Sequence, residues 1–278
     1  MEFLQKITPF VMLVFVVSSM LAVGLGLTVS QIVAPLRSIK LVSVALVANF
    51  VIMPAVAIGL AKVLRLEEPL GVGLLLLGMA AGAPFLPKLA QNAKGNVAFS
   101  VGLMVLLMVV TVGFLPLVLP LLLPGVSVDP GKIARSLVLL MLLPLAVALL
   151  VNAKFPNIAS RAKPPLAKIS GMTLLMVIGL FVVGNFSSVL SVFGTGGIFA
   201  SILFVTIALA LGWFLGGSSA DVRSVLGLGT AQRNIAAAVV VASQSFTDPK
   251  VVIMVVVTAI VGLVVLMPLS KKLGASKA

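Results

Sequence analysis

Long apolar runs separated by short polar links fill this 278-residue chain. A helix needs about 20 apolar residues to cross a bilayer. Seven uninterrupted runs approach or exceed that length, over 7–29, 39–61, 97–123, 133–151, 168–190, 197–217 and 250–270. Two more, over 69–92 and 222–245, are interrupted. The pattern predicts nine membrane spans in a single transport domain over 1–278, with no room for a soluble domain.

The two interrupted runs contain residues that break helices. The first has Gly82, Pro84 and Pro87 inside it, and proline removes a backbone donor. The second has two glycines and then a polar cluster: Gly227, Gly229, Thr230, Gln232, Arg233 and Asn234. Non-helical backbone at membrane depth is tolerated only where protein or a water-filled cavity satisfies it. Both runs are therefore predicted to be discontinuous helices that cross near mid-membrane.

The position of the breaks along the chain suggests an internal repeat. Each interrupted span is followed by one further span, and an odd separation of five spans gives the two halves opposite orientations. We expect approximate repeats over 1–125, with four spans, and 131–272, with five. Inverted repeats with discontinuous helices are typical of secondary transporters. The competing explanation is a non-transporting scaffold or sensor whose helices are kinked only for packing.

Composition supports an all-α integral membrane protein and removes most chemistry. Hydrophobic residues make up 61% of the chain and charged residues 9%, against about 25% charged in soluble proteins. The sequence has no His, Cys or Tyr, which excludes imidazole catalysis, thiol nucleophiles and His/Cys metal sites. No nucleophile and base form a visible pair, so we do not expect an enzyme. No basic run alternates with aromatic residues, so we expect no nucleic-acid partner.

The net charge of +13 is unevenly distributed between the predicted links. With the C-terminus in the cytoplasm, nine spans place the N-terminus outside. Twelve cations then lie inside: Arg37, Lys40, Lys88, Lys94, Lys154, Arg161, Lys163, Lys168, Arg223, Lys271, Lys272 and Lys277. Six lie outside: Lys6, Lys62, Arg65, Lys132, Arg135 and Lys250. Cytoplasmic loops are enriched in Lys and Arg, so we expect this orientation in a bacterial-type inner or plasma membrane.

Arg233 is the one cation predicted inside a span. Such a charge costs about 2.5–3.5 kcal/mol on insertion scales and usually faces a cavity. No acid lies within a helical turn of it, which favours an anionic partner. Half-helix N-termini beside the breaks would add positive potential. We therefore predict a site for a small organic anion, formed by Arg233, Asn234, Gly82, Ala83, Phe85 and Thr230.

Several segments together resemble the bile acid:sodium symporter family. They are VGLGLTVSQIVAPLRS, NFVIMPA, GMAAGAPF followed by AKGNVAFSV, and GTAQRNIAAA. The resemblance implies ten spans in two inverted repeats, a panel and a core domain, and two discontinuous helices that cross at the transport site. It also implies secondary transport of organic anions by alternating access, often coupled to sodium. This chain is expected to begin at the family's second span, which gives nine.

The sequence departs from the family where sodium is expected to bind. Family members carry a Ser/Asn pair in the first break and a Glu just before the second, and these groups hold two sodium ions. Here the first break reads Gly82 to Phe85, and no acid lies in Gly227–Ala231. In the next span, 97–123, the family's hydroxyl positions have become Met104, Leu107 and similar residues, and of those positions only Thr111 keeps a hydroxyl. The departures imply reduced or absent sodium coupling, with Arg233 substituting for the ion.

One alternative keeps a cation in place. Asn49 and Gln232 match family positions that help one sodium site, so a sodium-coupled symporter with a single residual site at these residues stays open. No other cofactor is expected. The substrate class also stays open, because bile acids, keto acids and pantoate-like acids would all fit a site made of an arginine and helix dipoles.

Overall fold

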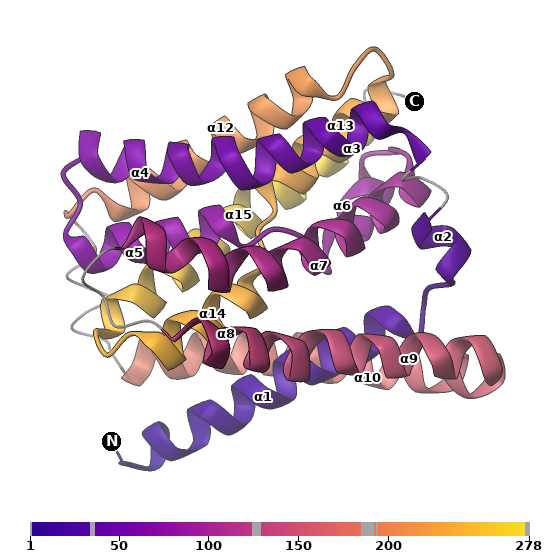
Figure 1. Ribbon diagram of the computed structural model, residues 1–278, viewed down its shortest axis with the longest axis horizontal. Coiled ribbons are helices and arrows are strands. Elements are labelled where there is room, and N and C mark those ends of the chain that lie inside the picture. Colours follow the sequence, from indigo (N-terminus) through magenta and orange to yellow (C-terminus); the bar gives the residue numbers. More distant parts are fainter. Residues whose placement is uncertain (1, 34–36, 124–128, 185–191, 193, 276–278) are drawn as a thin grey trace.

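The computed structural model describes residues 2–33, 37–123, 129–184, 192 and 194–275. All regular secondary structure in this described part is helical (Figure 1). In chain order the helices are α1 (Glu2–Gly24), α2 (Val29–Val33), α3 (Ile39–Val47), η2 (Ala48–Ile52), α4 (Met53–Val63), α5 (Glu68–Met79), α6 (Leu86–Asn92), α7 (Val97–Leu122), α8 (Pro130–Leu137), η3 (Val138–Leu142), α9 (Leu143–Lys154), α10 (Pro156–Gly184), α12 (Gly197–Leu215), α13 (Ala220–Ala231), α14 (Ile235–Ser245) and α15 (Pro249–Ala275). The segments η2 and η3 are single π-helical turns.

Seven helical stretches in the described part are long and apolar enough to cross a membrane. They correspond to seven of the nine predicted spans. The predicted span 69–92 is divided between α5 and α6, of 12 and 7 residues. The predicted span 168–190 lies in α10 up to Gly184, and its last residues fall outside the described part. The count of nine spans therefore stays a prediction.

Several helix ends differ from the predicted span boundaries. Helix α1 ends at Gly24, five residues before the predicted end at 29. Helix α10 begins at Pro156, so most of the predicted link over 152–168 is helical. Hydropathy locates the apolar part of a helix, whereas a helix continues wherever its backbone hydrogen bonds can continue. Pro156 suits a first helical position, where its missing N–H would have had no partner.

The helices form two bodies, as the resemblance implied. In the lower layer of Figure 1, α1 packs against α9 and α10, and α8 continues through η3 into α9. We call α1, α8–α9 and α10 the panel. The remaining long helices form the second body, the core domain, in which α5 packs on α15 and α4, and α12 packs on α13. Residues 224–231 of α13 and 236–242 of α14 are all buried, so the second interrupted span lies at the centre.

A π-turn positions one of the candidate residues. Pro54 lies in the first turn of α4 and cannot donate a backbone hydrogen bond, and the preceding turn widens into η2. Asn49 lies within this turn and is fully buried. Its amide Nδ2 donates to the carbonyl of Ala45 at 2.9 Å. The proline thus creates a bend at which a buried amide side chain faces the interior of the core domain.

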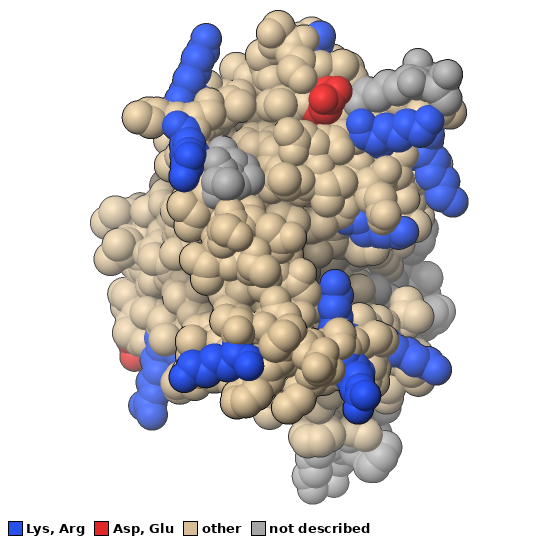
Figure 2. Space-filling model, turned by 90° about the vertical axis from the view of Figure 1, so that its right-hand side faces the viewer, with Lys and Arg blue, Asp and Glu red and all other residues tan. Residues whose placement is uncertain are grey.

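Charged side chains gather toward two ends of the molecule. Figure 2 looks onto the end at which many Lys and Arg side chains lie and few acids are visible. Lys277 lies outside the described residues. The other cations predicted to be inside lie near helix ends on this side, at the right of Figure 1: the start of α3, α6, the α9–α10 junction, and the ends of α13 and α15 nearest it. At the opposite end Lys250 pairs with Glu67. The described cations predicted to lie inside and those predicted to lie outside are therefore found toward opposite ends of the molecule.

Candidate functional site

The first interrupted span is broken by backbone geometry. Helix α5 ends at Met79, and Ala80 is extended. Gly82 has φ +81°, and a Cβ there would lie 2.2 Å from the backbone nitrogen of Met108. Glycine alone tolerates both the left-handed conformation and this close approach to α7. Helix α6 then begins at Leu86, with proline in its first turn.

A hydroxyl from the neighbouring helix satisfies the backbone of this first break. The Oγ1 of Thr111 on α7 accepts from the N–H of Ala81 at 2.9 Å and donates to the carbonyl of Ala81 at 3.0 Å. Thr111 is fully buried, so these two bonds replace the helical bonds that the break removes. The buried hydroxyl of Thr111 therefore supports the break.

The second interrupted span is broken by polar residues. Helix α13 ends at Ala231, and Gln232 is extended, with φ −82° and ψ 106°. Asn234 is the N-cap of α14, and its Oδ1 accepts from the N–H of Ala237 at 3.1 Å. An N-cap side chain of this kind satisfies a donor that the helix start leaves free. The chain thus leaves one half-helix and enters the next within Gln232–Asn234.

Hydrogen bonds join the two breaks directly. The backbone N–H of Asn234 donates to the carbonyl of Ala80 at 2.9 Å. The side-chain Nδ2 of Asn234 donates to the carbonyl of Gly82 at 3.2 Å. Both spans are therefore discontinuous and meet at their breaks, which confirms the predicted crossing of two discontinuous helices.

Arg233 extends this junction through its guanidinium. Its Nε donates to the carbonyl of Leu77 at 2.8 Å and its Nη2 to the carbonyl of Gly78 at 2.6 Å. Its Nη1 donates to the carbonyl of Thr230 at 3.0 Å and to Oδ1 of Asn49 at 2.6 Å. Four of the five guanidinium N–H groups are thereby used. The side chain is only 4% exposed.

The surroundings of Arg233 compensate its charge without a carboxylate. Leu77 and Gly78 lie in the last turn of α5, and Thr230 in the last turn of α13. Helix C-termini carry partial negative charge and favour a cation. Within the described part of the chain, none of the hydrogen-bond partners of Arg233 is an acidic side chain. Arg233 thus lies between the negative ends of two half-helices.

Asn49 and Gln232, the two residues predicted to hold a residual sodium ion, differ in their hydrogen bonding. Asn49 gives its oxygen to Arg233, and its Nδ2 lies 3.5 Å from the hydroxyl of Thr230. The side chain of Gln232 has no hydrogen-bond partner among the described residues. A cation at this site would need the oxygen of Asn49 that already accepts from Arg233.

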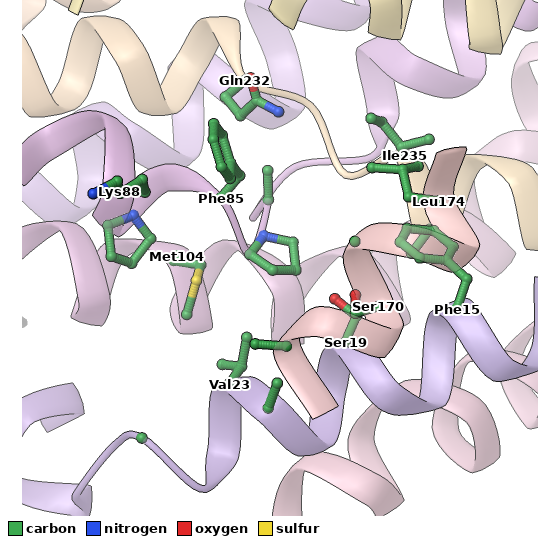
Figure 3. Close-up of a pocket in the computed structure, with 18 of the residues that line it drawn as sticks. Phe15, Ser19, Val23, Phe85, Lys88, Met104, Ser170, Leu174, Gln232 and Ile235 are labelled. Atoms are coloured by element: carbon green, nitrogen blue, oxygen red, sulfur yellow. The ribbon is translucent and has the colours of Figure 1, made fainter. Parts of the chain in front are cut away.

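A cavity of about 910 Å³ lies where the two breaks face the panel (Figure 3). Its lining comes from α1, α10, both breaks, α6, α7 and α15. Most lining side chains are apolar, among them Phe15, Phe85, Met104 and Leu174. A volume in this range suits a small organic ligand. The cavity is thus bounded by both bodies and by both discontinuous helices.

The polar groups of this cavity are few and are uncharged or cationic. Gln232 and Arg233 line it from the second break, and Ser19 and Ser170 line it from the panel. At its exposed edge, the lining residues include Lys88, Gln91 and Lys163. None of the described lining residues is acidic. The cavity therefore opens toward the cation-rich end of the molecule.

A contact between the bodies closes the other end. Helix α8 of the panel packs against α14 of the core domain. The hydroxyl of Ser136 on α8 donates to Oε1 of Gln244 on α14 at 2.6 Å. This contact joins the two bodies at the end opposite the exposed edge of the cavity.

The structure divides the six residues predicted to bind an anion into two groups. Ala83, Phe85 and Arg233 line the cavity. Gly82, Thr230 and Asn234 are buried behind it and hold the breaks together. Sequence reasoning missed Ser19, Ser170 and Lys163, because isolated serines are common in spans and nothing local shows that α1 and α10 face the breaks.

Comparisons with known proteins agree with this architecture. The model of the Sodium Bile acid symporter family matches residues 11–192. The "Uncharacterized sodium-dependent transporter YocS" of Bacillus subtilis (strain 168) is 30% identical over 173 residues, covering 60% of this chain and 52% of that protein. The "Probable sodium/metabolite cotransporter BASS2, chloroplastic" of Oryza sativa subsp. japonica is 30% identical over 176 residues, covering 63% of this chain and 42% of that protein.

A third relative also matches this chain over part of its length. The "Probable sodium/metabolite cotransporter BASS3, chloroplastic" of Arabidopsis thaliana is 27% identical over 186 residues, covering 66% of this chain and 43% of that protein. The chain spans about half the length of the curated relatives it matches. The family match covers more than half of the chain and confirms the resemblance seen in its motifs. This chain therefore belongs to the sodium bile acid symporter family, whose members are transporters rather than enzymes.

Proposed function

We propose that this chain is a secondary active transporter that moves a small organic anion by alternating access, with little or no coupling to sodium. One observation carries the proposal. A cavity touches both bodies and both helix breaks, and its exposed edge lies toward the cation-rich end. A movement of the panel against the core domain would close this side and open the other without disturbing the hydrogen bonds between the breaks.

The charges around the cavity favour an anion. Arg233 lines it, and Lys88 and Lys163 lie at its edge, while no described lining residue carries a negative charge. The first turn of α14, through Ile235 and Ala236, also lines the cavity and adds the positive end of a helix. A carboxylate with an apolar body matches this combination of cationic edge and apolar walls. Ala83 and Phe85 would contact the apolar body.

The hydrogen bonds of Arg233 support weak sodium dependence. Backbone carbonyls at unwound helix ends are the groups that coordinate sodium in transporters with broken helices. Here three such carbonyls and Oδ1 of Asn49 already accept from a guanidinium. We infer that Arg233 takes the electrostatic place of an ion and holds the crossing together permanently. The competing view, a sodium-coupled symporter with one site at Asn49 and Gln232, requires Arg233 to leave Asn49.

Uptake into proteoliposomes tests transport. The purified 278-residue chain should accumulate labelled small carboxylates above the level of protein-free liposomes. Gly171 lines the cavity, and no atom lies within 4 Å of a Cβ placed there. Gly171→Trp should therefore fill the cavity without a clash and reduce uptake at least tenfold.

The matched control is Gly113→Trp. Gly113 also has no atom within 4 Å of its Cβ, but it is exposed on α7 and does not line the cavity. This variant should transport within about twofold of wild type. No uptake by wild type for any carboxylate, or equal uptake by both tryptophan variants, would argue for a non-transporting membrane protein.

Replacing sodium by choline tests the coupling. Wild-type uptake should change little, because no described carboxylate is available to bind an ion at the breaks. Arg233→Ala should reduce uptake severely, and Arg233→Lys should be intermediate, because lysine keeps the charge but loses the planar fork. Strong sodium dependence of the wild type would favour the sodium-coupled alternative.

The charge separation also supports an orientation. We propose that the end carrying Lys88, Lys163 and Lys271 faces the cytoplasm. The cavity would then be open inward. Reporter fusions after Lys272 and in the Lys62–Arg65 link should report opposite sides of the membrane, and finding both on one side would exclude this orientation.

A further inference from the structure

The rod formed by α8, η3 and α9 changes its neighbours along its length. Helix α9 packs against α1 and α10 of the panel, and η3 packs against α1. Helix α8 packs instead against α7 and α14 of the core domain, and no comparable packing of α8 against α1 or α10 is found among the described residues. By its contacts α8 is therefore attached to the core domain, although it lies in line with α9 in Figure 1.

Close contacts anchor α9 in the panel. A Cβ placed on Gly24 of α1 would lie 2.6 Å from the Cβ of Ala148 and 2.7 Å from the carbonyl oxygen of Leu145, so α1 and α9 touch almost backbone to backbone. The Nδ2 of Asn152 on α9 donates to the carbonyl of Leu27, just beyond the end of α1, at 2.8 Å. A shift of α9 against α1 would disrupt both contacts.

A different set of contacts holds α8. The hydroxyl of Ser136 donates to Oε1 of Gln244 on α14 at 2.6 Å. Ile133 and Leu137 lie one turn apart on the same face of α8, and both are buried. Because α7 and α14 are the helices packed on α8, its buried face and its hydrogen bond both tie it to the core domain.

The change of neighbours coincides with an irregular backbone. The segment η3 is a single π-turn, and Pro144, two residues beyond it, has no N–H to donate back into the turn. Prolines and π-turns are the usual places at which helices bend, and hinges use such element ends. The turn η2 before Pro54 has the same form, but η2 and α4 both pack against α5 within the core domain. Of these two π-turns, η3 is therefore the one that joins the two bodies.

We propose that η3 and Pro144 form a hinge inside the α8–α9 rod, so that α8 moves with the core domain while α9 stays with the panel. This inference rests on the proposed function, because it takes the two bodies to move against each other. The bond between Ser136 and Gln244 then persists through the movement. The boundary between the moving parts runs through the middle of a span instead of its end.

Distances between pairs of spin labels, measured in lipid nanodiscs, test the hinge without requiring uptake. The chain has no cysteine, so an introduced pair carries the only labels. Exposed positions are available on all three parts: Lys62→Cys on α4 of the core domain, Arg135→Cys on α8 and Leu150→Cys on α9. The Lys62–Arg135 distance should be narrowly distributed. The Arg135–Leu150 and Lys62–Leu150 distances should be broadly distributed, because both pairs span the hinge.

A second helix provides the matched control for the pair across the hinge. Phe199 and Phe214 are exposed at the two ends of the continuous helix α12 and have the same sequence spacing as Arg135 and Leu150. This spacing corresponds to about 22 Å along a straight helix. The distribution for Phe199→Cys with Phe214→Cys should be narrow, and that for Arg135–Leu150 at least about twice as wide.

Proline substitutions test the cause of the bending. Pro144→Ala restores the missing N–H, so it should narrow the Arg135–Leu150 distribution toward that of the α12 pair. Pro120→Ala removes a proline from inside α7, away from the hinge, and should leave the distribution broad. Melting curves establish that both variants are folded.

The outcomes distinguish the hinge from transport. A narrow Arg135–Leu150 distribution with a broad Lys62–Arg135 distribution overturns the hinge, because α8 then moves with the panel. Three narrow distributions also overturn it, because the bodies then do not move. Broad Arg135–Leu150 and narrow Lys62–Arg135 distributions in a protein with no uptake would support the hinge and remove the transport function.

A cross-link adds a functional test. A short bifunctional thiol reagent that joins Ser136→Cys to Gln244→Cys should leave uptake within about twofold of the same variant before linking, because both residues belong to one moving body. Loss of uptake on linking, with recovery when the link is cleaved, would show that α8 must leave α14 and would overturn the hinge.

Discussion

The two helix breaks lie against each other but are made in different ways. The first, between Met79 and Leu86, contains no polar side chain and depends on Gly82 and on prolines. The second, Gln232–Asn234, consists of three polar side chains. Arg233 and Asn234 supply side-chain donors to the backbone of the first span, at Leu77, Gly78 and Gly82. No side chain of the first break makes a hydrogen bond to the second, because residues 80–85 carry no polar side chain.

This asymmetry shows that one break supplies the shape and the other supplies the hydrogen bonds. Gly82 lets the first span approach α7 closely, where Thr111 bonds to Ala81. The second break uses its side chains on the carbonyls that the first leaves free. Two segments that look comparable in sequence are thus one structural unit, in which Arg233 is the central bond donor.

The largest effect is expected for Arg233→Ala. Its removal leaves four acceptors without their donor. Each unsatisfied buried group costs about 1–3 kcal/mol, although water entering the space would offset part of this. We expect a loss of about 3 kcal/mol or more, measured by unfolding in bicelles, and partial recovery of the melting temperature with millimolar guanidinium.

Wild type provides the control for this rescue. Guanidinium at the same concentration should not stabilise it, because the space between the half-helices is occupied. Sodium and tetramethylammonium, compared in the Arg233→Ala variant, report whether the vacated carbonyls accept a small ion. If Arg233→Ala melts like wild type, Arg233 does not stabilise the junction between the two breaks.

Gly82→Ala should be next in size and tests the first break. A Cβ at this position adds the cost of the left-handed conformation, about 1–2 kcal/mol, to a clash with the backbone of Met108. We expect a total loss of about 3 kcal/mol. Gly113→Ala on α7 has open space around it and should be neutral or stabilising by up to about 1 kcal/mol. Equal melting of the two variants would show that the first break does not depend on glycine.

Thr111→Val should have an intermediate effect. It keeps the shape of the side chain but removes the hydroxyl that bonds to both backbone groups of Ala81. We expect a loss of about 2 kcal/mol in unfolding measurements, whereas Thr111→Ser, which retains the hydroxyl, should lose less. If valine and serine behave alike, the backbone of the first break has another source of hydrogen bonds.

The smallest effect is expected for Asn234→Ser. Serine can still cap α14 by accepting from Ala237, but it cannot reach the carbonyl of Gly82 as the amide does. The loss should be about 1 kcal/mol, and Asn234→Ala should lose about 1 kcal/mol more because the cap is also removed. A serine variant as stable as wild type would show that Asn234 acts only as the cap of its own helix, and would weaken the link between the breaks.

Much of the fold follows from patterns that are local in sequence. Apolar runs located seven of the long helices, and the glycine, proline and polar clusters located both discontinuous spans. A charge in the middle of an apolar run marked Arg233 without any structural information. These signals are local because the bilayer penalises each polar or broken segment individually, wherever the rest of the chain lies.

The orientation of individual side chains was decided only by the tertiary structure. The sequence predicts that Arg233, Asn234 and Thr230 bind an anion. In the structure, Asn234 and Thr230 face the buried junction instead. Four of the five N–H groups of Arg233 bond to protein oxygens. The lining residues Ser19, Ser170 and Lys163 come from helices far from the breaks in sequence. Which oxygens surround a buried guanidinium, and which hydroxyls face a cavity, depend on the packing of α1 and α10 against the crossing. That packing is a property of the assembled helices and of no single segment.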